Sequence, residues 1–200
     1  ESSSDLVTLE MPGTYTLVAR SGGIAASPYT FSVTTTTQRL IMTNESYVGQ
    51  LTGQSDAQIY LIALDEATPL LVQMEAVDFD SRSEVYVRRG APPTRGTYDY
   101  RVSSGGSSSE SLLVPYAVAG DWYVLVYGAH VPTPSDYSIK VTASDAIAQS
   151  SSPKQVDAAS NVLITVKGAG FVLGTNVYLV DDEGNVLASG AVDIDGFKQI

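Results

Sequence analysis

The sequence predicts an all-β chain of tandem antiparallel β-sandwich modules, jelly-roll-like in type, of which the first and the last are incomplete. Short segments alternate apolar and polar side chains with the period of two that a half-buried strand requires. Turn residues separate these segments, and none of the 200 residues falls in a convincing helical pattern. A sequence motif that covers two predicted strands, called the repeated phrase below, also occurs twice, about one domain length apart, which indicates repeated modules.

The repeated phrase sets the length of the module. Its copies lie at 13–18 with 28–33 and at 120–125 with 136–141. The first halves are 107 residues apart and the second halves 108. Each copy is interpreted as two antiparallel strands, with Tyr15 and Trp122 at one shared inward position. Because twelve residues precede the first copy, residues 1–37 are expected to be the C-terminal strands of a preceding sandwich.

The complete module is expected at 38–144. Its predicted strands are 39–42, 46–51, 58–64, 69–76, 83–89, 98–102, 112–116, 120–127 and 136–141. The stretch 103–111, rich in glycine and serine, has no side chain that could anchor a core and is predicted to be a flexible loop.

A different pattern follows the complete module. Small and polar residues at 145–157 predict a linker, and 158–200 is expected to be the N-terminal part of an immunoglobulin-like β-domain. Its predicted strands are 162–166, 168–171, 175–180 and 186–189. Asp181 to Asn185 is predicted to form a hairpin turn, because it lacks the alternating acids of a calcium-binding loop.

Composition limits the partners. The hydrophobic fraction of 44% can supply a buried core, and the net charge of −11 makes nucleic acid and anionic membranes poor partners, while cations and neutral polymers remain open. The absence of cysteine excludes disulfides and thiolate metal sites. No apolar run of about 18 residues occurs, so no membrane insertion is expected. Abundant serine, threonine, glycine and tyrosine with scarce lysine indicate an extracellular or cell-surface protein.

Short motifs in the central module occur in a characteristic order. They are 49–51 before 58–62, 77–80 leading into 84–87, and 120–127 with 137–141. In this order the region from 38 to 143 resembles a bacterial pre-peptidase C-terminal (PPC) domain, and residues 5–33 resemble the tail of a second copy. The resemblance implies a jelly-roll-like sandwich of the kind appended to secreted proteases and found in tandem in large surface proteins.

The central module departs from the PPC pattern at one place. Where the family often has two acids before the long core strand, 53–60 keeps only Asp56, which puts the calcium role of collagen-binding relatives in question.

The last segment resembles a different family. There, 166–171 followed by 174–179 resembles the opening of an IPT/TIG immunoglobulin-like domain.

No catalytic or cofactor-binding residue is predicted. His130 is the only histidine and lies in a predicted loop, so a serine-histidine-aspartate triad would have to be built around it. The sequence has no nucleophile elbow, zinc-protease motif, phosphate-binding loop or dinucleotide fingerprint. The chain is therefore predicted not to be an enzyme.

Carboxylates give the only candidate metal site. Asp78 and Asp80 would share one face of a strand, and Glu84 follows four residues later, so together they could offer hard oxygen ligands to calcium. The simpler interpretation, which we favour, makes them solvated turn residues partly balanced by Arg82. Asp193 and Asp195 would also share a face if extended.

Aromatic residues are the remaining candidates for binding. A flat platform for sugars or peptide could be lined by Tyr98, Tyr100, Tyr116, Tyr123 and Tyr127. Tyrosine on a sandwich strand is more often rim packing with its hydroxyl at the edge, and we favour that interpretation. Trp122 is predicted to lie in the core.

Two functions fit these expectations. The first is a structural or adhesive repeat region whose modules act as spacers or assembly units, contacting neighbouring modules or identical chains through edge strands. The alternative is an accessory region that binds substrate or assists secretion for an extracellular hydrolase. A hydrolase domain before residue 1 would support the alternative, and further sandwiches would support the first.

Overall fold

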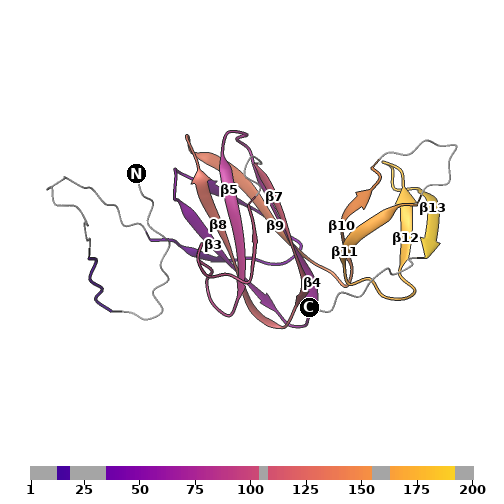
Figure 1. Cartoon of the computed structure of the whole chain (residues 1–200), viewed down its shortest axis with the longest axis horizontal. Coiled ribbons are helices and arrows are strands. Elements are labelled where there is room, and N and C mark those ends of the chain that lie inside the picture. The colour runs from indigo at the N-terminus through magenta and orange to yellow at the C-terminus, as the bar shows by residue number, and fades with distance from the viewer. Residues whose placement is uncertain (1–12, 19–34, 104–107, 155–162, 192–200) are drawn as a thin grey trace.

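The computed structural model describes residues 13–18, 35–103, 108–154 and 163–191 (Figure 1). All regular structure within these residues is β-strand, in sheets that pack together and are antiparallel apart from one short pair of strands. The predicted all-β sandwich class is therefore confirmed.

The central sandwich consists of two sheets (Figure 1). The five-stranded sheet has the order β1-β3-β8-β5-β6, with β1 at Gln38–Leu40, β3 at Ala57–Leu64, β8 at Gly120–His130, β5 at Arg82–Arg89 and β6 at Tyr100–Val102. The four-stranded sheet has the order β2-β9-β4-β7, with β2 at Ser46–Leu51, β9 at Ser135–Ala143, β4 at Thr68–Ala76 and β7 at Ser109–Ala117. Only the short β1 pairs in parallel, with β3, among these strands.

The core lies between the two sheets. Alternate residues of β8, Trp122, Val124 and Val126, face inward and are buried, as the sequence predicts. The Trp122 indole donates a hydrogen bond to the Val118 carbonyl at 2.9 Å, so its polar atom is satisfied inside the sandwich. The face of β8 that points away from the core is also largely buried, which means that something other than the second sheet covers it.

A pair of tyrosines joins the two sheets inside the core. The hydroxyls of Tyr60 in β3 and Tyr137 in β9 are 2.7 Å apart, and both side chains are sealed from solvent. Gly49 in β2 leaves the space that the pair needs, because a Cβ there would lie 2.5 Å from the Tyr137 hydroxyl and 2.7 Å from that of Tyr60. Gly49 and Tyr137 belong to the motifs that carry the predicted resemblance.

The structure differs from the sequence prediction in the region of the first repeat. Residues 13–18 form no strand, and Tyr15 and Leu17 are 53% and 64% exposed. Alternation shows only that a segment could be half-buried in a sheet. In the part of the chain that the structure describes, no strand pairs with residues 13–18. The predicted partner strand at 28–33 lies outside the described residues.

The predicted loop 103–111 is shorter in the structure. Residues from Ser109 onward belong to β7 and pair with β4, where Ser109 is opposite Glu75. Serine has no apolar side chain to reveal this strand, but its backbone still completes the ladder. Residues 104–107 lie outside the described part of the chain.

Four strands follow the central sandwich. Strand β10 at Ile147–Ser152 pairs with β11 at Thr165–Ala169, and β12 at Asn176–Val180 pairs with β13 at Val186–Ala191. Part of the predicted linker 145–157 therefore forms a strand, where small and polar residues led us to expect none. The strand forms because its backbone bonds to β11 while Ile147 is buried. Strand β10 also contacts β4, and β11 contacts β7.

The turn between β12 and β13 is the predicted hairpin. The Asp181 carboxylate accepts hydrogen bonds from the Asn185 amide at 2.8 Å and the Glu183 amide at 3.0 Å. The hydrogen bond from the Asn185 side chain at 2.9 Å, followed by these backbone bonds, lowers the pKa of Asp181. Its oxygens are thus used by the turn itself.

Candidate functional site

The outer face of the five-stranded sheet carries a second cluster of buried side chains. It consists of Ala57, Ile59, Tyr86, Leu125 and Tyr127, with Tyr98, Tyr123 and Ala129 packed against it. Strand register places them side by side, because Glu84 is opposite Tyr127 and Tyr86 is opposite Leu125. We call this cluster, together with Glu84, Arg95 and Arg101, the outer-face site.

The connection between β5 and β6, residues 90–99, covers part of this face. Asp99 fixes its end, because its amide donates to the Val87 carbonyl at 2.9 Å and its carboxylate accepts from the Arg89 amide at 2.8 Å. Tyr98 then packs on Tyr86 with ring centroids 5.2 Å apart. This connection explains why the outward side chains of β8 are buried.

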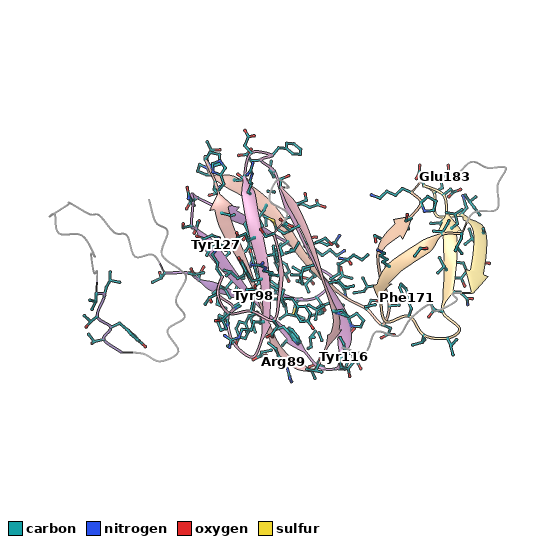
Figure 2. The ribbon with its side chains drawn as sticks, viewed as in Figure 1. Arg89, Tyr98, Tyr116, Tyr127, Phe171 and Glu183 are labelled. Carbon is teal, nitrogen blue, oxygen red and sulfur yellow. The ribbon has the colours of Figure 1, made fainter. Side chains whose placement is uncertain are left out.

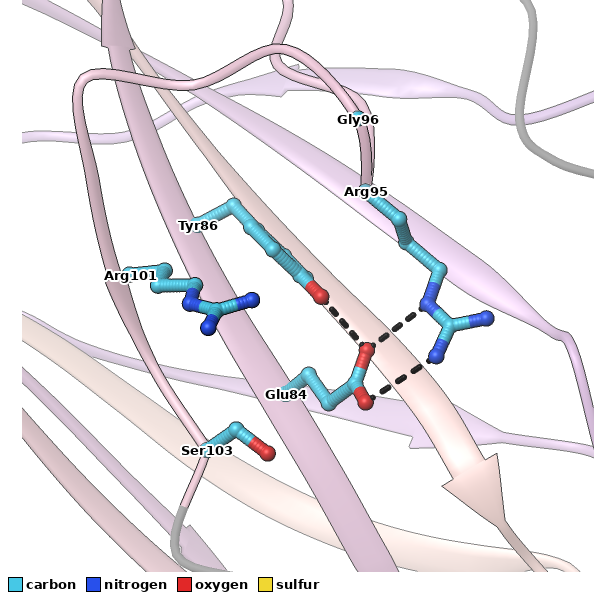
Figure 3. A pocket seen from close by; sticks show the side chains of 6 residues that line it. All are labelled: Glu84, Tyr86, Arg95, Gly96, Arg101 and Ser103. Atoms are coloured by element: carbon cyan, nitrogen blue, oxygen red, sulfur yellow. Dashed lines mark hydrogen bonds and ion pairs between the residues drawn. The ribbon is translucent and has the colours of Figure 1, made fainter.

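A hydrogen-bonded triad lies at the centre of the site (Figure 3). Arg95 approaches Glu84 with two parallel contacts, Nε to Oε2 at 2.8 Å and Nη2 to Oε1 at 3.1 Å. The Tyr86 hydroxyl donates to the same Oε2 at 2.6 Å. The Arg95 guanidinium also lies 4.6 Å from the centre of the Tyr127 ring, so an aromatic contact and a bidentate ion pair both fix it.

The triad perturbs the titration of its members. Burial opposes ionisation of Glu84, but the hydrogen bonds from Arg95 and Tyr86 outweigh it, so the pKa of Glu84 lies below its ordinary 4.5. Burial, and then the bond to the Glu84 carboxylate, raise the pKa of Tyr86 to about 12. Glu84 is therefore an ionised acceptor at neutral pH, and Tyr86 a neutral donor.

Arg101 lies across the site from Arg95. Its guanidinium is 5.5 Å from the centre of the Tyr98 ring, and in the part of the chain that the structure describes its side chain makes no hydrogen bond or ion pair. It acts on Glu84 only through space, by lowering its pKa. The N–H donors of Arg101 are therefore available to a ligand.

A pocket of about 450 Å³ opens between these side chains (Figure 3). Its lining consists of Glu84, Tyr86, Arg95, Gly96, Arg101 and Ser103. The two arginines and one glutamate give it a formal charge of +1, whereas the chain as a whole carries −11. The pocket is thus a local positive site on a strongly acidic protein.

The structure does not gather the three predicted calcium ligands. Glu84 pairs with Arg95, while Asp78 closes the turn between β4 and β5. Its carboxylate accepts from the Asp80 amide at 3.0 Å and from the hydroxyls of Ser81 and Thr133 at 3.2 and 3.3 Å. Among the described residues no group of three acidic, histidine or cysteine side chains could hold a metal. Asp193 and Asp195 lie outside them.

The five candidate tyrosines divide among three environments, and three of them, Tyr98, Tyr116 and Tyr127, are labelled in Figure 2. Tyr98, Tyr123 and Tyr127 join the outer-face cluster. Tyr100 packs against the core beside Trp122, with ring centroids 6.4 Å apart, and Tyr116 is 66% exposed on the other sheet. The predicted platform of five is therefore not one surface.

Several features of the site had no clear signal in the sequence. The pair Glu84 and Tyr86 could have been placed on one face of a strand by its spacing of two. Arg95 comes from the covering connection, eleven residues after Glu84, and no local pattern joins them. His130, predicted in a loop, is the exposed last residue of β8 and does not line the pocket.

Comparison with known proteins gives matches among solved structures alone. No family model matches the chain, and no curated protein does. Among solved structures it is similar to the pre-peptidase C-terminal domain of collagenase from Bacillus anthracis, with 14% identity and a TM-score of 0.44 over 56% of this chain and 100% of that domain. That domain is of the kind that the central motifs resemble.

Two other solved structures are periplasmic inhibitors of g-type lysozyme. PliG from Aeromonas hydrophila has 14% identity and a TM-score of 0.34, over 54% of this chain and 100% of that one. PliG from Salmonella Typhimurium has 11% identity and a TM-score of 0.31, over 54% of this chain and 98% of that one.

Proposed function

We propose that the central sandwich is a non-catalytic adhesive module of a secreted or cell-surface protein, and that the outer-face site binds its ligand. One observation carries the proposal: tyrosines and arginines gather around a pocket on the side of the sheet that faces away from the core. Tyrosine and arginine are the residue types enriched at the centres of binding surfaces.

Preorganisation supports a binding role. Both oxygens of Glu84 are taken by Arg95, and Tyr86 and Tyr98 pack on one another, so the walls of the pocket are fixed before a ligand arrives. A surface that is already ordered loses less entropy on binding.

The described residues contain no helix long and apolar enough to cross a membrane.

The same geometry argues against catalysis in the pocket. Glu84 is the single carboxylate in its lining, and its lowered pKa keeps it ionised at neutral pH, so it has no proton to donate. Both of its oxygens are already used as acceptors. No histidine lines the pocket to serve as a base.

Retention on immobilised polymers tests the proposal. The 200-residue chain would be passed over gelatin, cellulose and peptidoglycan, as representatives of polypeptide, polysaccharide and mixed polymers. We expect retention on one of them, and a loss of at least about tenfold with Tyr98→Ala, since aromatic anchors dominate such surfaces. Tyr116→Ala is the control, because Tyr116 is exposed on the other sheet. Retention that Tyr98→Ala leaves unchanged, or no retention at all, would contradict the proposal.

A spacer role is a second candidate, and the junction after the central sandwich supports it. Strand β10 continues from the sandwich into the β10–β11 pair, and both strands also contact the four-stranded sheet. Gly170 has φ +79°, and a Cβ there would meet the Asp145 carbonyl. Such a junction would hold the neighbouring module in a fixed direction.

Small-angle scattering tests this second candidate. We expect a narrow distribution of dimensions for the wild-type chain and a broader one for Gly170→Ala, because the added methyl group forces the junction open. Gly190→Ala is the matched control, since a Cβ there meets nothing within 4 Å. A wild-type distribution as broad as that of Gly170→Ala would rule out a rigid spacer.

A further inference from the structure

We propose that the outer-face pocket receives one isolated carboxylate of an extended protein ligand, an aspartate or glutamate side chain, and that Arg101 is the residue that binds it. The inference rests on the proposed binding role of the outer face and names the chemistry that the pocket selects. It depends on the difference between the two arginines of the pocket.

The two arginines differ in what occupies them. The Arg95 guanidinium makes a bidentate pair with the Glu84 carboxylate, through hydrogen bonds of 2.8 and 3.1 Å. It thereby neutralises the one anion in the pocket, which would otherwise repel an incoming carboxylate. Arg101 has no such partner among the described residues, so the pocket keeps one uncompensated positive charge.

The position of Arg101 suits a planar anion. Its guanidinium lies over Tyr98, and Figure 3 shows it directed toward the side of the pocket where Glu84 lies. Contact with an aromatic ring orients the fork while leaving its edge free. A carboxylate matches that edge with two parallel hydrogen bonds, and the Ser103 hydroxyl in the same lining offers a further donor.

The overall charge favours an isolated carboxylate over a dense polyanion. A chain with net charge −11 repels any ligand that carries one negative charge per repeat, such as an acidic polysaccharide. A single acidic side chain within a neutral peptide is repelled far less, and the charges closest to it in the pocket sum to +1. A protein segment with sparse acids is therefore the favoured ligand.

A titration followed by NMR tests the inference on the full 200-residue chain labelled with ¹⁵N. The probe is the blocked peptide acetyl-Gly-Glu-Gly-amide, and acetyl-Gly-Gln-Gly-amide is its neutral control. We expect the glutamate peptide to shift the amide signals of the pocket residues and the glutamine peptide to bind at least about tenfold more weakly, because a charge-assisted pair is lost.

Variants locate the effect at Arg101. Arg101→Met is expected to weaken binding of the glutamate peptide at least about tenfold. Arg101→Lys should give an intermediate loss of affinity, because the charge stays while the bidentate geometry of the guanidinium is lost. Arg82→Met is the matched control, since it removes the same charge from the exposed start of β5. Fluorescence of Trp122, the only tryptophan and a buried one, checks that each variant is folded.

Several results would overturn the inference. Equal binding of the two peptides, no binding of either at millimolar concentration, or a glutamate affinity unchanged in Arg101→Met would each do so. Tighter, Arg101-dependent binding of polygalacturonate would replace the protein ligand by an acidic polysaccharide. If one of these results occurs while the wild-type chain is retained on a polymer and Tyr98→Ala is not, the proposed function stands and this inference falls. If the wild-type chain is not retained on any polymer either, both fall.

Discussion

Tyrosines on opposite faces of one sheet have different tasks in this protein. On the inner face, Tyr60 bonds to Tyr137 across the core, and neither is reached by solvent. On the outer face, Tyr86 bonds to the charged Glu84, which Arg95 holds. The inner pair joins two sheets, whereas the outer triad shapes a pocket. The residue type therefore does not decide the role; the charge and the covering segment beside it do.

The two faces also differ in why their tyrosines resist ionisation. Burial, followed by the neighbouring Tyr60, raises the pKa of Tyr137, and burial raises that of Tyr60. On the outer face, burial and then the Glu84 carboxylate raise the pKa of Tyr86. The inner pair is thus a packing feature that any change of volume should damage, while the outer triad is an electrostatic feature that pH should damage.

The largest expected effect comes from filling the space beside the inner pair. In Gly49→Ala the new methyl group would lie 2.5 Å from the Tyr137 hydroxyl, so one ring or the strand must move. We expect the free energy of unfolding to fall by about 1–3 kcal/mol, as for other overpacked cores. Urea unfolding followed by Trp122 fluorescence measures it, because Trp122 lies in the same sandwich.

A matched variant separates packing from the loss of glycine as such. A Cβ at Gly53 meets nothing within 4 Å, so Gly53→Ala should change stability by less than about 0.5 kcal/mol. An equal loss in both variants would show that the inner pair is not closely packed against Gly49. Folded Gly49→Ala protein should still bind the glutamate peptide, since the added methyl group lies in the core and not in the outer-face pocket.

A smaller effect is expected from breaking the hydroxyl bonds on each face. Tyr137→Phe leaves the Tyr60 hydroxyl buried without its partner, which we expect to cost about 1–3 kcal/mol. Tyr60→Phe combined with Tyr137→Phe should recover part of that loss, with a coupling energy of about 0.5–3 kcal/mol. Urea unfolding of the two single variants and the double variant measures the cycle.

The outer face provides the comparison for this cycle. Tyr86→Phe should cost under about 1 kcal/mol, because Glu84 keeps both contacts to Arg95 and lies nearer to solvent. If Tyr86→Phe proved the more damaging substitution, the assignment of packing to the inner face and electrostatics to the outer face would be wrong.

The inner face was predictable and the outer site was not, for a physical reason. Alternation along a strand states which residues share a face, so Trp122 and its neighbours could be assigned to the core from the sequence. The outer site depends on the register between β5 and β8 and on a connection that folds back over both. Neither has a period in the sequence, and no local pattern joins Arg95 to Glu84, eleven residues before it.

The acidic residues illustrate the same limit. The spacing of Asp78, Asp80 and Glu84 was compatible with a calcium site, but spacing does not show which hydrogen bonds already occupy the oxygens. In the structure a turn uses Asp78 and an arginine uses Glu84. The hairpin at Asp181 was predictable because its partners lie within four residues along the chain.

The smallest expected effect is the response of the outer triad to acid. The folded pKa of Glu84 lies below its ordinary 4.5, so its contribution to stability is present above 4.5 and disappears as pH falls through the folded pKa. Near neutral pH the free energy of unfolding of wild type should exceed that of Glu84→Gln by under about 1 kcal/mol, since Arg95 is partly exposed. This difference should vanish in acid. The loss caused by Tyr137→Phe should stay constant over that range, because tyrosine remains neutral throughout. Urea unfolding of the three proteins between pH 7 and 3 measures both differences, and a Glu84 difference independent of pH would mean that the side chain contributes by packing and not by charge.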